Sequence, residues 1–173
     1  MRAVTLPLVN SYWVIPARFL AGEHPFGENP HDAQDRFAAL RAAGIDFFLD
    51  LTEIGERPAY QRLLHRSARY VRFPIVDCGV PVHDEQMRQI QAAIRAALAE
   101  NRKLYIHCRA GIGRTGLVVG CYLADDGLRG DAALKKLNKL WRHSARSTTW
   151  PALPQTDEQA NYIRRWSERA QAG

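Results

Sequence analysis

The pattern of apolar and polar residues predicts strands and helices that alternate along the chain. Short apolar runs bounded by glycine, proline or polar residues are typical of buried strands, whereas apolar residues three and four positions apart mark one face of a helix. On these criteria strands are expected at Tyr12–Ile15, Arg18–Ala21, Ile45–Leu51, Tyr70–Ile75 and Lys103–Cys108. Helices are expected at Asp32–Ala43, Pro58–Ala68, Asp84–Ala99 and Leu117–Leu123, after Asp131, and from Tyr162 to Trp166.

This alternation also predicts the fold class. Strands separated by helices form α/β layers, so we expect a single domain over residues 1–173, with a central, mostly parallel sheet flanked by helices. The run from Leu117 to Leu123 is apolar nearly all round, which predicts a buried helix. In such sheets ligands bind beyond the carboxyl ends of the strands. Cys108 lies at that end of the fifth predicted strand.

Composition narrows the class of protein. Hydrophobic residues make up 46% of the chain, which is typical of a globular domain. No run of eighteen apolar residues is present, so the chain is not expected to span a membrane. The N-terminal residues, from Met1 to Pro7, have no signal-peptide core, and three cysteines do not suggest a disulfide framework. These features predict a cytoplasmic protein.

The segment from His107 to Gly116 carries the clearest chemistry. Its sequence, HCRAGIGRTG, places Cys108 and Arg114 six positions apart, and apolar runs enter and leave it. A strand, a tight loop and a helix are therefore expected, with the loop's backbone N–H groups turned inward at a helix N-terminus. Such a loop binds a phosphate-like anion and stabilises a cysteine thiolate. The Cys-x5-Arg spacing alone is a weak signal, but the histidine, glycines and threonine make the pattern far more demanding.

Each part of this loop has an expected task. Cys108 is the proposed nucleophile, which would form a cysteinyl-phosphate and divide the hydrolysis into two steps. Arg114 would bind two phosphate oxygens through its planar fork, which lysine cannot reproduce. The glycines let the backbone approach the anion closely. The phosphate cradle comprises the backbone N–H groups of Arg109, Ala110, Gly111, Ile112, Gly113 and Arg114.

This segment resembles the signature loop of the cysteine-dependent protein tyrosine phosphatase superfamily, in particular its small bacterial, dual-specificity-like members. Two further segments agree with the resemblance and follow the order of that family. Phe73–Pro81 is similar to the movable acid loop of dual-specificity phosphatases, and Gln155–Gln159 is similar to the glutamine loop of tyrosine phosphatases. The resemblance implies the phosphatase fold and its two-step chemistry.

The acid loop supplies a candidate general acid. Asp77 lies just beyond a predicted strand and before Gly79 and Pro81, and it matches the acid of the family's loop. A carboxyl group on a closing loop protonates the departing oxygen and then accepts a proton from the attacking water. Val76 stands where many relatives have proline. The alternative acid is Asp84, which also suits the start of the following helix.

Four further residues have two interpretations each. His107 either orients the loop by hydrogen bonding, as the resemblance implies, or is a hydrogen-bonded core histidine. Thr115 either donates to the Cys108 sulfur or caps the helix. Gln155 and Gln159 match the residues that position the hydrolytic water. Thr156 to Gln159 is also a capping box for the final helix, and both interpretations can hold at once.

Charge is distributed unevenly between the two halves of the chain. The net charge is +6, and residues 87–173 carry 15 of the 24 basic residues but only 7 of the 18 acidic ones. A positive half that contains the signature loop would attract an anionic substrate. Solvated surface arginines explain the same charge, because arginine outnumbers lysine 20 to 4. No aromatic-basic interleaving or zinc-ligand spacing suggests nucleic acid.

Together these features predict a phosphomonoesterase that uses no metal and no cofactor. Its expected substrates are phosphoproteins, with phosphotyrosine first and phosphoserine or phosphothreonine also accepted. A phosphoinositide or inositol phosphate is the alternative substrate, because Arg109 lies inside the loop and the basic segment Arg142–Arg146 would suit its entrance. A third hypothesis is a catalytically silent phosphate-binding module, which needs the cradle but neither Cys108 nor Asp77.

Overall fold

Five strands form one sheet in the order β1-β2-β5-β3-β4. The structure is a computed structural model that describes residues 4–169, so residues 1–3 of the N-terminal segment lie outside it. Strands β2, β5, β3 and β4 are mutually parallel, and β1 pairs antiparallel with β2 at one edge, which confirms the mostly parallel sheet. The strands are β1 (Ser11–Ile15), β2 (Phe19–Gly22), β3 (Phe47–Asp50), β4 (Arg69–Arg72) and β5 (Leu104–His107).

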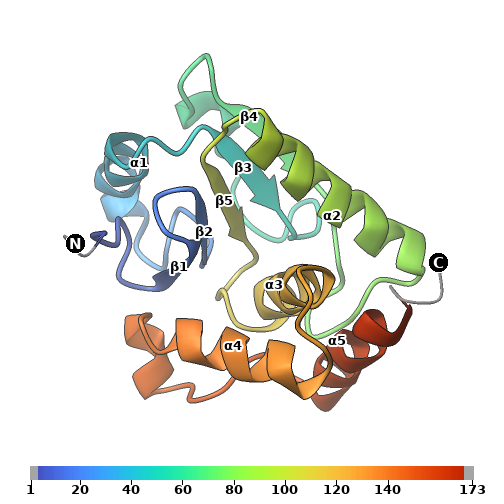
Figure 1. Ribbon diagram of the computed structural model, residues 1–173. Helices are drawn as coiled ribbons and strands as arrows, with labels where there is room; N and C mark the ends of the chain where they lie inside the picture. Colours follow the sequence, from blue (N-terminus) through green and yellow to red (C-terminus); the bar gives the residue numbers. More distant parts are fainter. Residues whose placement is uncertain (1–3, 170–173) are drawn as a thin grey trace.

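Helices cover both faces of this sheet. The α-helices are α1 (Ala33–Ala42), α2 (Asp84–Ala99), α3 (Gly113–Asp125), α4 (Asp131–Trp141) and α5 (Asp157–Arg169). Short 3-10 turns are η1 (Pro30–Asp32), η2 (Gln61–Leu63) and η3 (Ala145–Thr148). Figure 1 shows α1 on one side of the sheet and α2 and α3 on the other, with α4 and α5 packed beyond α3.

The alternation of side chains along β5 divides the interior into two apolar clusters. Leu104 and Ile106 belong to the larger cluster, which includes residues of α2, α3, α4 and α5. Tyr105 belongs to the smaller cluster, with Phe37 and Leu40 of α1. Successive residues of a strand point to opposite faces, so one central strand contributes to both clusters.

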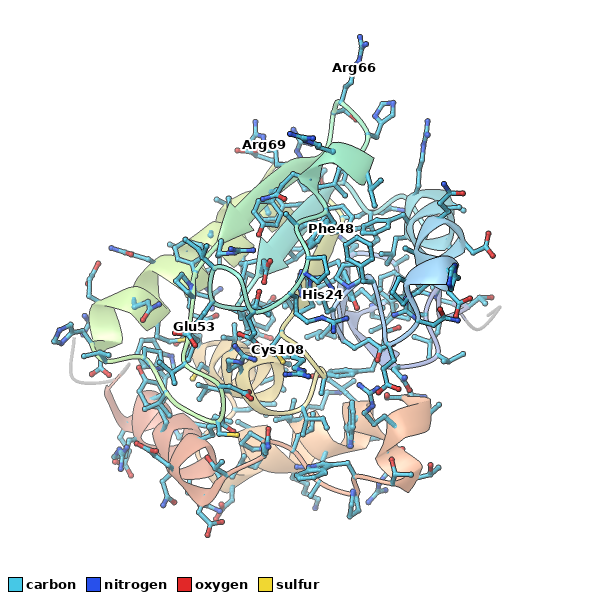
Figure 2. All side chains as sticks on the ribbon, turned by 180° about the vertical axis from the view of Figure 1, so that it is seen from behind. His24, Phe48, Glu53, Arg66, Arg69 and Cys108 are labelled. Carbon is cyan, nitrogen blue, oxygen red and sulfur yellow. The ribbon has the colours of Figure 1, made fainter. Side chains whose placement is uncertain are left out.

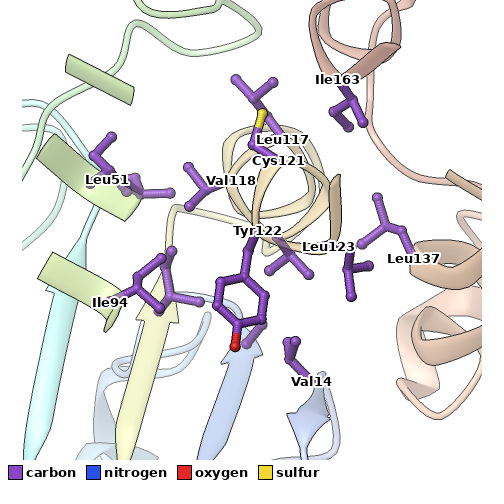
Figure 3. Packing of buried hydrophobic residues seen from close by; sticks show 14 of the residues in the cluster. Val14, Leu51, Ile94, Leu117, Val118, Cys121, Tyr122, Leu123, Leu137 and Ile163 are labelled. Carbon is purple, nitrogen blue, oxygen red and sulfur yellow. The ribbon is translucent and has the colours of Figure 1, made fainter. Parts of the chain in front are cut away.

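Helix α3 lies at the centre of the larger cluster, as its apolar sequence predicted. Its side chains from Leu117 to Ala124 are buried against the sheet and three other helices (Figure 3). An added Cβ at Gly120 would overlap Ile163 of α5, so the glycine permits the close approach of these helices. The helix begins at Gly113, four residues before the predicted start, directly after the signature loop.

The predicted helix at Pro58–Ala68 is wrong. The chain makes only the turn η2 there, because the buried Tyr60 side chain faces His107. Farther along, the backbone N–H of Ser67 donates to Nδ1 of His65. Local side-chain bonds of this kind compete with helical ones. The other predicted helices and strands are confirmed, with ends displaced by a few residues.

The described residues contain no helix that combines the length and the apolar character needed to cross a membrane.

Candidate active site

The signature loop connects β5 to α3 at the carboxyl end of the sheet. In Figure 2, Cys108, His24 and Glu53 come from three segments that follow β5, β2 and β3 and meet at this end. Gly111 has φ of +76°, and an added Cβ would lie 2.5 Å from the backbone carbon of Gly22. Both its conformation and its surroundings therefore require glycine. Cys108 is buried at the start of this loop.

The backbone of the loop is fixed from outside. The carbonyl of Arg109 accepts a bond from His24 N at 3.0 Å, and the carbonyl of Ala110 accepts one from Arg146 Nη1 at 2.6 Å. Within residues 4–169, the backbone N–H groups of residues 109–112 donate to no acceptor of the chain. This arrangement leaves a row of donors for an anion at the N-terminus of α3.

Arg114 is 1% exposed and lies at the end of the loop. Nη1 donates to Glu56 Oε2 at 2.8 Å and to Ile75 O at 3.0 Å. Nη2 donates to Glu56 Oε1 at 2.6 Å and lies 3.1 Å from Asp77 Oδ1. Nε is buried and has no partner among the described residues. An unpartnered buried donor beside the loop is what an anion would satisfy.

Charge is retained on both members of the Arg114–Glu56 pair. Hydrogen bonding from Arg114 lowers the pKa of Glu56, although partial burial acts in the opposite direction. Burial lowers the pKa of Arg114, but the Glu56 hydrogen bonds and the nearby Cys108 outweigh it and raise the pKa above its ordinary value. Arg114 is thus a guanidinium beside the thiol, as a phosphate-binding residue requires.

Asp77 reaches the same site from the loop after β4. Its side chain is 57% exposed, and Oδ1 accepts a hydrogen bond from Cys78 N at 3.1 Å besides facing Arg114. Cys78 has φ of +61°, an uncommon conformation for a non-glycine residue that turns the chain here. The alternative acid, Asp84, is instead the first residue of α2 and accepts from Tyr162 Oη at 2.9 Å.

The two glutamines flank the loop but differ in their surroundings. An added Cβ at Gly113 would lie 2.9 Å from Gln155 Oε1 and 3.1 Å from Gln159 Nε2. Gln159 is buried. Its Oε1 accepts from Thr156 N, while its own N–H donates to Thr156 Oγ1, so the capping box is present. Nε2 of Gln159 donates to Gly79 O at 3.0 Å, which ties α5 to the acid loop. Gln155, in contrast, is exposed.

Thr115 lies in the first turn of α3 and does not cap it. The N-cap residue is Ile112, and no side chain makes a capping bond there. The Thr115 hydroxyl donates to Gly22 O at 3.5 Å. This contact links the start of α3 to the end of β2.

His107 is buried behind the nucleophile. Its Nδ1 lies 3.1 Å from Cys108 O and its Nε2 2.6 Å from Tyr60 Oη. Burial lowers the pKa of His107, so the neutral ring donates from Nδ1 and accepts the Tyr60 hydroxyl at Nε2. The ring therefore holds the carbonyl of Cys108.

Asp50 extends this polar group at the end of β3. Its Oδ1 accepts from Thr52 N and Oγ1, and its Oδ2 accepts from Tyr70 Oη at 2.7 Å and Arg72 Nη2 at 3.1 Å. Burial raises the pKa of Asp50, but His107 and the hydrogen bonds from Thr52 and Tyr70 outweigh it and bring the pKa to about 2. Oδ1 of this charged carboxylate lies 3.9 Å from Nδ1 of His107.

Sequence reasoning missed Glu56, Tyr60 and Asp50. Asp50 carried a signal, because a carboxylate near the end of a predicted buried strand needs partners. Glu56 and Tyr60 lie in or beside the segment that was predicted to be helical, and their contacts with residues 47 to 58 positions away depend on the order of the strands. That order was not predicted.

A groove of about 820 Å³ lies elsewhere, beside α1. Its lining includes Phe37, Ile45 and Phe48 of the smaller apolar cluster, and none of Cys108, Arg114 and Asp77. This groove is therefore separate from the site formed by Cys108, Arg114 and Asp77.

Comparison with known proteins agrees with this geometry. Residues 9–161 match the family described as PTP-SAK, Swiss Army Knife protein, DSP-PTPase phosphatase domain. The chain therefore belongs to the dual-specificity and tyrosine phosphatase family.

Two viral proteins are related to the chain. It is 34% identical over 110 residues to a candidate tyrosine phosphatase, 067L, of Invertebrate iridescent virus 3, covering 61% of the chain and 44% of the viral protein. It is 30% identical over 142 residues to a candidate tyrosine phosphatase, 197R, of Invertebrate iridescent virus 6, covering 80% of the chain and 48% of the viral protein. The chain thus spans about half the length of these relatives.

Solved structures share the fold. Tk-PTP in its active form superposes with a TM-score of 0.72 at 23% identity, covering 92% of this chain and 97% of that one. PTPMT1 in complex with PI(5)P superposes with a TM-score of 0.70 at 17% identity, covering 93% of this chain and 97% of that one. At these identities the likeness shows the phosphatase fold.

Proposed function

We propose that the protein is a cysteine-dependent phosphatase that hydrolyses phosphomonoesters on proteins, with phosphotyrosine preferred and phosphoserine or phosphothreonine also accepted. The observation that carries this proposal is the position of Asp77 Oδ1, 3.1 Å from Arg114 Nη2, while the buried Nε of that arginine has no partner among the described residues. An acid, an anion-binding guanidinium and the loop that begins with Cys108 converge there. Such convergence has no structural need in a silent binding module.

In the first step the Cys108 thiolate attacks phosphorus. The Sγ–P bond forms and the bond from phosphorus to the ester oxygen breaks. Asp77, in its protonated form, gives its proton to the departing oxygen. Arg114 and the loop N–H groups hold the phosphoryl oxygens, whose charge they stabilise through the transition state. Because Asp77 and phosphate compete for Nη2 of Arg114, substrate binding would release the carboxyl group for this task.

In the second step water attacks the phosphorus of the cysteinyl-phosphate. The Sγ–P bond breaks, the thiolate leaves and inorganic phosphate forms. Asp77, now ionised, takes the proton from the attacking water. Gln155 is the better placed glutamine for positioning that water, because its amide lies beside Gly113 whereas Gln159 is engaged in the capping box and with Gly79.

A phosphoinositide is the second candidate substrate. Arg109 is exposed within the signature loop, where its charge acts on Glu56, and no ion pair of Arg109 occurs among the described residues. A free guanidinium at the mouth suits a second phosphate group. The structural likeness to PTPMT1, solved with PI(5)P, is compatible with this alternative. Arg146, in contrast, is held by Glu23 and the loop, and is not free at the entrance.

We place this single phosphatase domain in the cytoplasm. Three free cysteines support a reducing compartment, where the Cys108 thiol remains usable.

The decisive experiment measures phosphate release without added metal from a phosphotyrosyl peptide, a phosphothreonyl peptide and a short-chain phosphoinositide. Cys108→Ser is the control. Peptide turnover that disappears in the control supports the proposal and ranks the residue preference. Turnover of the lipid alone would support the cysteine mechanism but show that the substrate is a phosphoinositide rather than a phosphoprotein. Absence of wild-type turnover, with retained binding of inorganic phosphate, supports the silent module.

A further inference from the structure

Glu23 is a buried carboxylate outside the catalytic group. It follows the last residue of β2 and is 3% exposed. Each of its oxygens faces a different arginine: Arg36 Nη2 lies 2.7 Å from Oε1, and Arg146 Nη2 lies 2.8 Å from Oε2. Asn10 Nδ2 also donates to Oε2 at 3.2 Å. A buried charge with this many partners fixes the direction of the groups that bind it.

Arg146 connects this carboxylate to the signature loop. Arg146 lies in η3. The first residue of this turn, Ala145, donates a backbone hydrogen bond to Val9 O, before β1, at 2.8 Å. While Nη2 faces Glu23, Nη1 donates to the carbonyl of Ala110 at 2.6 Å. The side chain is 15% exposed, and Nη2 also lies 3.4 Å from the exposed Glu28. One planar guanidinium thus spans the carboxylate and the loop.

The contact with Ala110 determines where the next N–H group points. In a trans peptide the carbonyl and the following N–H point in opposite directions. Because Arg146 holds the Ala110 carbonyl on the outside of the loop, the N–H of Gly111 is directed away from Arg146. His24 N holds the Arg109 carbonyl in the same way, which directs the N–H of Ala110. Neither N–H has an acceptor among residues 4–169.

We propose that Arg146 is a positioning residue that orients the Gly111 N–H toward the phosphoryl group by holding the Ala110 carbonyl, and that Glu23 orients Arg146. The proposal rests on the phosphatase function proposed above. A guanidinium bonded to the carbonyl also polarises the peptide and strengthens its N–H as a donor. Preorganised donors act mainly on the charge that develops in the transition state. Loss of Arg146 therefore lowers kcat more than it raises KM.

The test compares Arg146→Met, which keeps the apolar stem, with Arg146→Lys and with Arg88→Met. Arg88 is a matched control, since among residues 4–169 its one ion pair is the exposed pair with Glu85 on α2. Calorimetry measures tungstate binding to each variant in the Cys108→Ser background, well below its unfolding temperature. In this background we expect Arg146→Met to weaken tungstate binding about tenfold. In the protein that retains Cys108, the same substitution should lower kcat by about ten- to a hundredfold, with a smaller change in KM. Lysine cannot reach both acceptors and should give intermediate values.

Glu23→Gln tests the second half of the proposal. It should weaken tungstate binding in the same direction, and its effect should largely disappear in the Arg146→Met background, because both changes act through one guanidinium. A tungstate affinity within about twofold of the parent in Arg146→Met overturns the proposal, whatever the unfolding temperature. Absence of Cys108-dependent turnover in the wild type would instead reject the proposed phosphatase function, and the tungstate measurements would still decide the task of Arg146.

Discussion

Arg114 and Glu56 form a bidentate pair across 58 residues, with Nη1–Oε2 and Nη2–Oε1 distances of 2.8 and 2.6 Å. The arginine is 1% exposed, so its plane is determined by the carboxylate rather than by solvent. The pair engages Nη1 and Nη2 and leaves the buried Nε without a partner among the described residues. Two parallel hydrogen bonds specify an angle as well as a distance. Glu56 is therefore the residue that orients the guanidinium of Arg114.

Substitution of Glu56 tests this relationship. Glu56→Gln replaces one of the two acceptor oxygens by a donor, so the fork can no longer bind it bidentately. We expect kcat/KM to fall by about ten- to a hundredfold and the free energy of unfolding to fall by about 2 kcal/mol, the usual range for a hydrogen bond to a charged group. Glu53→Gln, at an exposed position on the same loop, is the control and should change neither value. Equal kinetics in the two variants would contradict the assignment.

Substitutions of the two glutamines should have different effects, one on kinetics and the other on stability. Gln155→Ala removes an amide that lies beside Gly113, so it should slow hydrolysis of the cysteinyl-phosphate without lowering the unfolding temperature. Rapid-quench measurements would then show a larger burst of the released alcohol before the steady state. Gln159→Ala removes the capping box and the bond to Gly79, and should destabilise the protein by about 1–2 kcal/mol. A burst unchanged in Gln155→Ala would remove its proposed role.

The close approach of α3 and α5 depends on Gly120. An added Cβ there overlaps Cδ1 of Ile163 and lies 2.8 Å from Cγ1. Overpacking costs about 1–3 kcal/mol, which exceeds the helix propensity of about 1 kcal/mol that alanine contributes. Gly120→Ala should therefore lower the free energy of unfolding in the wild type. In an Ile163→Ala background the overlap is absent, and the same substitution should be neutral or stabilising. Equal effects of Gly120→Ala in the two backgrounds, measured by urea unfolding, would show that contact with Ile163 does not determine the cost of the substitution.

The sequence was most informative where function depends on neighbours along the chain. Cys108, the loop glycines and Arg114 follow one another closely in sequence, so their spacing predicted an anion cradle between a strand and a helix. The apolar periodicity of Asp84–Ala99 predicted α2 with its bounds. The residues that orient Arg114 and the signature loop, such as Glu56 and Arg146, come from distant segments. Contacts between distant loops depend on strand order and loop conformation, which periodicity does not encode.

Local ambiguity also explains the remaining differences. Thr156–Gln159 fits both a capping box and a glutamine loop, and the structure places Gln159 in the first arrangement while its Nε2 contacts the acid loop. The segment after Pro58 contains good helix formers, but burial of Tyr60 against His107 prevails over that propensity. In both segments the local sequence allowed more than one structure, and contacts with distant residues determined which one formed.

Acid should destabilise the protein through its buried histidines. His24 is 1% exposed, and burial lowers its pKa from 6.5 to about 3, helped by its neighbour His107, whose own pKa is lowered by burial. Between these two pH values the unfolded chain binds a proton at residue 24 that the native state does not bind. The free energy of unfolding therefore falls as pH falls from about 6.5 toward 3, by up to about 1.4 kcal/mol per pH unit for this group.

Substitution of His24 separates this contribution from the others. His24→Gln retains a polar acceptor near Phe26 N, whose N–H donates to Nδ1 at 3.2 Å in the wild type, but it does not titrate. Urea unfolding across the range from about pH 7 to about pH 4 should give a shallower loss of stability in this variant than in the wild type. His31→Gln changes an exposed histidine and leaves the buried pair in place. The stabilisation of Asp50, whose pKa is about 2, is present above its unfolded value of 3.8 and is lost only as pH falls toward 2. Parallel curves for the wild type and His24→Gln would mean that His24 already accepts a proton in the folded state over this pH range.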